Sequence, residues 1–66
     1  MKYNVGDIVF LKQSKLYAYV NQVYTDSLGM NWYTFKYQVP QRFGGRTVDC
    51  ETLNENGFLQ RIEKVP

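Results

Sequence analysis

The sequence predicts a single small all-β domain of five strands, and three observations point to this fold class. Apolar and polar residues alternate along most of the 66-residue chain, which is the side-chain period of a strand, and no stretch carries the apolar stripe of a helix. The aromatic content is high, with six Tyr, four Phe and one Trp, and aromatic residues favour strands. Clusters of Gly, Asn, Asp and Pro separate the β-prone stretches, as is typical of turns.

The strands themselves are predicted from runs rich in Val, Tyr and Phe. The first follows the turn-like pair Gly6 and Asp7 and is apolar on both faces, so we expect it to be covered on both. The third is the most β-prone stretch of the chain. The five predicted strands cover residues 7–12, 16–24, 31–39, 46–52 and 58–62.

The breaks between these strands contain residues suited to turns. Gly29 can supply a positive φ in the connection between the second and third strands. Pro40 has no amide proton and ends the third strand, and Gly44 and Gly45 form the next turn. Gly57 closes one tight or 3₁₀ turn before the last strand.

The turn lengths predict the register between strands, and the register predicts the core. The expected cross-strand pairs are Tyr24 with Asn31, Val20 with Phe35, Ala18 with Tyr37, Val39 with Arg46, Tyr37 with Val48, Phe35 with Cys50 and Lys36 with Asp49. This register keeps one face of three strands apolar, and a slip by one residue would destroy it. The predicted buried face comprises Ala18, Val20, Phe35, Tyr37, Val48 and Cys50.

Five short strands with a tight turn before the last one resemble the small Src-homology-3-type β-barrel. Residues 5–10 (Val-Gly-Asp-Ile-Val-Phe) are similar to the Val-Gly-Asp-x-Val opening of many bacterial Tudor-like and KOW-like domains, and residues 48–53 (Val-Asp-Cys-Glu-Thr-Leu) precede the turn. The resemblance covers most of the chain in outline. It implies a five-stranded barrel with one 3₁₀ turn, a bacterial or phage source, and a non-enzymatic module that binds peptides, RNA, DNA or other subunits.

The composition excludes several classes of function. The chain has no His and one Cys, Cys50, so it cannot build a Ser–His–Asp or Cys–His catalytic arrangement, a structural zinc site or an intramolecular disulfide. We therefore expect no enzymatic activity, cofactor or metal ion. The longest apolar run, residues 8–11, is far shorter than the ~20 residues of a membrane span. With a free thiol and no apolar leader segment, the expected compartment is the cytoplasm.

Candidate binding residues lie on the predicted solvent face and in the glycine-rich turn. Parity places Tyr17, Tyr19 and Trp32 opposite the core, where exposed aromatic side chains can contact a protein or stack on bases. Residues 27–48 contain no acidic side chain. The other candidate residues come from this stretch and are Lys36, Arg42, Phe43 and Arg46. The alternative is structural: the aromatic residues only cover the sheet, and Phe43 folds back on the domain.

Two further sets of polar side chains are expected to be structural. Asp49 and Glu51 share one strand face, a spacing that can serve acid–base chemistry or bind a divalent cation. However, Lys36 is expected opposite Asp49 and would neutralise it across the strands. Cys50 lies on the predicted apolar face and is expected to be a small core residue.

The favoured function is therefore a non-catalytic module that binds a partner protein through the aromatic and basic face. In the alternative, the module binds nucleic acid, with Arg42 and Arg46 gripping phosphate while Phe43 stacks on a base. A third hypothesis is a self-associating structural subunit, because a domain this small can gain stability from oligomerisation.

Overall fold

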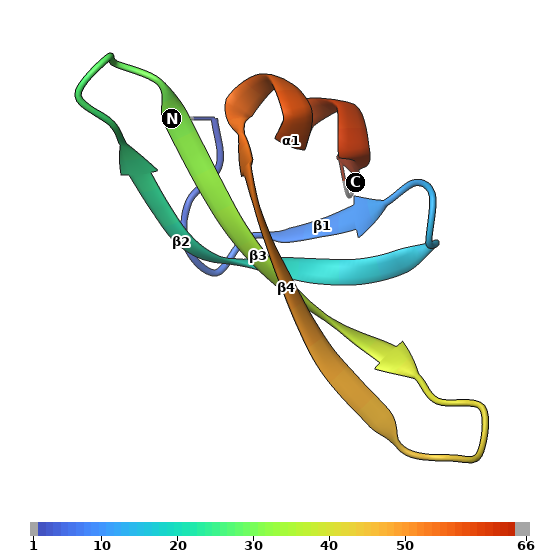
Figure 1. Cartoon of the computed structure of the whole chain (residues 1–66). Helices are drawn as coiled ribbons and strands as arrows, with labels where there is room; N and C mark the ends of the chain where they lie inside the picture. The colour runs from blue at the N-terminus through green and yellow to red at the C-terminus, as the bar shows by residue number, and fades with distance from the viewer. Residues whose placement is uncertain (1, 65–66) are drawn as a thin grey trace.

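The computed structural model describes residues 2–64 and consists of one antiparallel sheet with a short helix on one face (Figure 1). Its elements are β1 (Ile8–Leu11), β2 (Leu16–Thr25), β3 (Asn31–Pro40), β4 (Arg46–Asn54), α1 (Glu55–Arg61) and β5 (Ile62–Lys64). The strand order is β4-β3-β2-β1-β5, so the sheet is open and β4 and β5 form its two edges. The prediction of five antiparallel strands is confirmed, whereas the closed barrel is not observed.

The end of the chain differs most from the prediction. Residues 53–57 were expected to form a 3₁₀ turn before a strand over residues 58–62, but the α-helix α1 occupies most of this segment. The side chain of Asn54 caps this helix by accepting a hydrogen bond of 2.8 Å from the Gly57 amide. Glu55 in the first turn and Arg61 in the last complement the helix dipole. Phe58 is the buried residue of this helix and packs against Tyr33 and Phe35 of the sheet.

A β-bulge changes the register of the first long hairpin. Val20 lies opposite Phe35, as predicted, but the register shifts between Val20 and Gln22. Beyond the shift, Tyr24 lies opposite Trp32 and not opposite Asn31. The extra residue on β2 shifts the alternation by one position, so that Val23 lies opposite the buried Tyr33 and packs against the core.

The register between β3 and β4 is shifted by one residue from the prediction. Pro40, and not Val39, lies opposite Arg46. The physical reason is the turn, in which the Gln41 amide donates to the Gly45 carbonyl. The observed pairs include Lys36 with Cys50, Tyr37 with Asp49, Phe35 with Glu51 and Gln38 with Val48. The predicted pair of Lys36 with Asp49 is therefore wrong, and the side chains of β4 point to the opposite faces from those predicted.

The core lies between the sheet and α1 on what we call the inner face; the outer face is the opposite one. The buried side chains are Val9, Leu11, Ala18, Val20, Tyr33, Phe35, Phe58 and Ile62. Phe58 stacks on Tyr33 with ring centroids 4.6 Å apart and also contacts Phe35 at 5.4 Å. Of the predicted core, Ala18, Val20 and Phe35 are buried and Tyr37 is half-buried, while Val48 and Cys50 are exposed because of the register shift.

The hairpin that joins the end of β3 to the start of β4 projects away from the core (Figure 1). We call residues 38–48 the arm. Val39 is half-buried, and the other residues of the arm are exposed. The molecule is elongated, with a longest extent of 44 Å. Both faces of the arm are therefore open to solvent, and cross-strand pairing holds it together.

Candidate functional site

The β1–β2 hairpin and the β3–β4 hairpin diverge and leave an open hollow of about 410 Å³ between them. The pairing between β2 and β3 ends at Ala18 and Tyr37. Beyond this point the start of β2 pairs only with β1, and the end of β3 pairs only with β4. The sheet thus splits into two branches, as Figure 1 shows. The hollow is lined by Lys15, Leu16, Tyr17, Tyr19, Lys36, Tyr37, Gln38 and Arg46.

Basic and aromatic side chains dominate this lining. Lys15, Lys36 and Arg46 supply three positive charges, and the described residues that line the hollow include no acidic side chain. Tyr17 and Tyr19 are 65% and 44% exposed, so their rings are available to a ligand. Such a surface can bind negatively charged groups while packing against apolar or planar ones.

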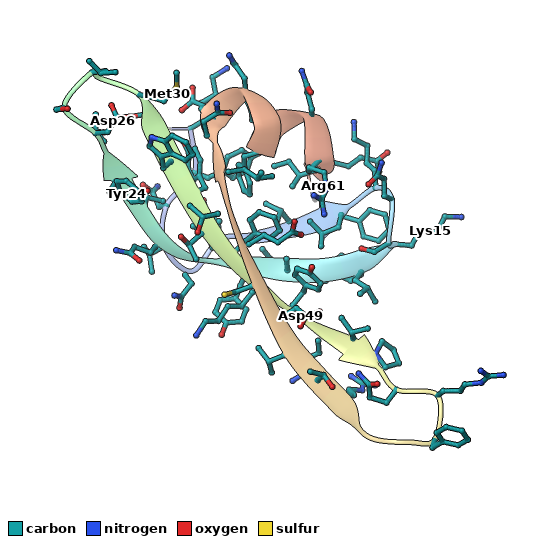
Figure 2. All side chains as sticks on the ribbon, in the orientation of Figure 1. Lys15, Tyr24, Asp26, Met30, Asp49 and Arg61 are labelled. Carbon is teal, nitrogen blue, oxygen red and sulfur yellow. The ribbon has the colours of Figure 1, made fainter. Side chains whose placement is uncertain are left out.

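Local structure holds two of the cations at the hollow. Lys15 adopts a left-handed conformation with φ of 58°, and its amide donates a 2.8 Å hydrogen bond to the Leu11 carbonyl, which closes the β1–β2 turn. Arg46 donates from its guanidinium to Oε1 of Gln38 at 3.3 Å, across the start of the arm. In Figure 2 Lys15 extends from the end of the β1–β2 turn.

The carboxylate pair lies on the inner face, away from the outward-pointing cations. Glu51 accepts two hydrogen bonds from the Arg61 guanidinium, at 2.9 and 3.2 Å, and a third of 3.0 Å from the Tyr37 hydroxyl. The Arg61 guanidinium lowers the pKa of Glu51. Burial raises the pKa of the Tyr37 hydroxyl, and its bond to Glu51 raises it further. Glu51 is therefore a structural anion that connects β4 to α1.

Trp32 does not line the hollow, although it points to the same sheet face. It is half-buried, stacks on Tyr24 with ring centroids 6.4 Å apart, and donates a 2.9 Å hydrogen bond to Asp26. The Asp26 carboxylate also accepts from the Leu28 and Met30 amides, each at 2.9 Å. Figure 2 shows Tyr24, Asp26 and Met30 grouped at this turn, well away from Lys15. These contacts favour the structural interpretation of Trp32 as sheet cover.

The remaining predicted site residues lie at the tip of the arm. Phe43 is 97% exposed and does not fold back on the domain. Arg42 precedes it in the same turn, where Gly44 and Gly45 both have positive φ. Of the seven predicted residues, the structure therefore gathers Tyr17, Tyr19, Lys36 and Arg46 around one hollow and places the other three elsewhere.

Four lining residues were not predicted from the sequence: Lys15, Leu16, Tyr37 and Gln38. Their positions depend on where the pairing between β2 and β3 ends, which no local pattern specifies. One feature of the sequence could have indicated Lys15 as a site residue. Lys15 lies two residues before the outward-pointing Tyr17, so its cation extends the basic and aromatic surface.

No protein-family model, curated protein or solved structure matches this chain. Within residues 2–64, no group of three or more His, Cys, Asp or Glu side chains is arranged to hold a metal ion. In the same part of the chain, no helix is long and apolar enough to cross a membrane.

Proposed function

We propose that the protein is a non-catalytic interaction module that binds a partner protein through the hollow and the outer face around it. The observation that carries this proposal is the joint position of Tyr17, Tyr19, Lys36 and Arg46 around one open hollow. Tyr side chains provide a large contact area and lose little rotamer entropy on binding. Arg adds charged and stacking contacts, and both residue types are enriched among the side chains that dominate binding energy.

Several features support a binding role over catalysis. The chain has no His, which is the commonest general acid or base. The Glu51 carboxylate is engaged by Arg61 and Tyr37. The five antiparallel strands support the proposed resemblance to Src-homology-3-type domains, although α1 replaces the 3₁₀ turn that the resemblance implies. The free thiol of Cys50 supports a reducing compartment, for which we propose the cytoplasm.

Nucleic acid is the second candidate partner, and the tip of the arm supports it. Arg42 and Phe43 project there beside two flexible glycines, and Phe43 is fully available for stacking. An arm that carries a cation and an exposed ring can contact a phosphate and a base together. Self-association is a third candidate, supported by β4, a nine-residue strand that forms one edge of the described sheet.

Affinity capture from the source cells tests the proposed function. We expect the wild-type protein to retain a partner protein after nuclease treatment, and the double variant Tyr17→Ser, Tyr19→Ser to lose it. Tyr24→Ser is the matched control, because Tyr24 is also an exposed Tyr of β2 but lies far from the hollow. Loss of the captured material on nuclease treatment would support the second candidate. Unchanged capture by the double variant would show that the outer face is not the binding site.

A further inference from the structure

We infer that the segment of the partner that occupies the hollow is acidic and also carries apolar side chains. This inference rests on the proposed function and specifies the chemistry of the ligand at the same site. It follows from two properties of the outer face, namely the distribution of charge and the side chains at the margin of the hollow.

The first property is the separation of acidic from basic side chains across the sheet. By strand alternation, none of the outward-pointing residues of β2, β3 and β4 is acidic. The nearest carboxylates along these strands are on the inner face of β4: Glu51 accepts from Arg61, and Asp49 lies opposite Tyr37 but does not line the hollow. A carboxylate that enters the hollow therefore meets Lys15, Lys36 and Arg46, and the described residues that line the hollow include no acidic side chain. A basic segment would be excluded from the hollow for the same reason.

The second property is the aliphatic margin of the hollow. Ile8 pairs with Tyr19 and is 53% exposed, while Val48 pairs with Gln38 and is 58% exposed. Both side chains thus flank residues that line the hollow. A ligand that covers them gains the free energy of apolar burial, which requires apolar groups next to its carboxylates. A peptide with both residue types fits this pattern.

These features favour a peptide over a nucleic acid at this position. The cations gather around one hollow and do not form a track along which a strand of phosphates could run. The formal net charge of the chain is only +2. In addition, Trp32, the best stacking side chain of the outer face, is engaged by Tyr24 and Asp26.

Selection from a random twelve-residue peptide display library on the immobilised full chain tests this inference. We expect the selected peptides to be enriched in Asp and Glu, with apolar residues between them. In fluorescence anisotropy with these peptides, Lys36→Gln and Arg46→Gln should each weaken binding by about two- to fivefold, as for an exposed ion pair. Lys12→Gln is the matched control, because Lys12 is exposed but does not line the hollow. Circular dichroism of each variant verifies that it is folded.

The outcomes separate this inference from the proposed function. Selected peptides that are neutral or basic, but still depend on Tyr17 and Tyr19, would overturn the inference and leave the proposed function standing. Peptides that bind independently of both tyrosines, or no selected peptide at all, would overturn both. A random single-stranded DNA library is selected in parallel. If its members bind the hollow more tightly than the peptides and lose affinity in Lys36→Gln, the ligand is a nucleic acid and the inference is wrong.

Discussion

Glu51 on the edge strand β4 and Arg61 in the last turn of α1 form a bidentate ion pair, with its shorter contact at 2.9 Å. The pair fastens the helix to the part of β4 that lies over the core. Both side chains are about one-third exposed or less, 34% for Glu51 and 28% for Arg61, so water weakens their attraction. The Tyr37 hydroxyl adds a third hydrogen bond to the same carboxylate.

This pair predicts a stability that depends on pH. Because Arg61 lowers the pKa of Glu51 in the folded state below the ordinary value of 4.5, the stabilisation is present above that value and is lost as the pH falls through the folded pKa. We expect Glu51→Gln to lower the free energy of unfolding by about 1 kcal/mol or less at pH 7. Urea denaturation at several pH values measures the effect. A difference from wild type that stayed constant into strong acid would contradict the role of the Glu51 charge.

Two phenylalanines provide a matched comparison of the core with the arm. Phe35 is fully buried against Phe58, and Phe43 is 97% exposed. We expect Phe35→Ala to cost about 3–5 kcal/mol of unfolding free energy, and Phe43→Ala to change it by no more than about 0.5 kcal/mol. Equal losses, measured by chemical denaturation, would mean that the arm tip packs on the domain.

The cap of α1 predicts another pair of contrasting variants. Asn54→Ala removes the acceptor for the Gly57 amide and should destabilise the protein by about 1 kcal/mol. Asn56→Ala lies within the exposed part of the same helix and should have little effect or be slightly stabilising, because Ala favours helices. Thermal unfolding followed by circular dichroism compares the two. If both variants had the same melting temperature, the capping role of Asn54 would be wrong.

Cys50 reports the register between β3 and β4 in solution. The observed register places its thiol on the exposed outer face opposite Lys36. We therefore expect one thiol equivalent to react with Ellman's reagent in the native protein, at a rate close to that in denaturant. Strong protection of the thiol in the folded protein would instead favour the register predicted from the sequence, in which Cys50 is buried.

The sequence was informative where one face of a strand is buried and uninformative where both faces are exposed. Val20 and Phe35 are buried partners, so burial fixes their register and the alternation of residues reveals it. In the arm, neither face is buried, and the spacing of Val39 and Val48 carries no information on the pairing. The α1 segment was misassigned because Phe58 and Ile62 are four residues apart, a spacing that fits both a helix and a strand.

The candidate site was predictable to a similar extent. Strand parity places Tyr17, Tyr19 and Lys36 on one face, and this requires only the register near the core. The hollow itself results from the divergence of two hairpins, which depends on sheet twist and on the end of pairing at Ala18 and Tyr37. Neither is encoded by a local run of residues. The distance of Trp32 from the hollow follows from its position at the opposite end of β3.

The exposure of the arm on both faces has a consequence for how this protein can diversify. Substitutions among residues 41–48 disturb no buried side chain, so their effect on the free energy of unfolding is small, except at Gly44 and Gly45, whose positive φ angles strain other residues. Arg46, which lines the hollow, belongs to this segment. Under the proposed function, substitutions in the arm can therefore alter the ligand preference while the half of the molecule beneath α1 keeps the domain folded. The arm thus contributes Gln38 and Arg46 to the proposed binding surface without contributing a buried side chain to the core.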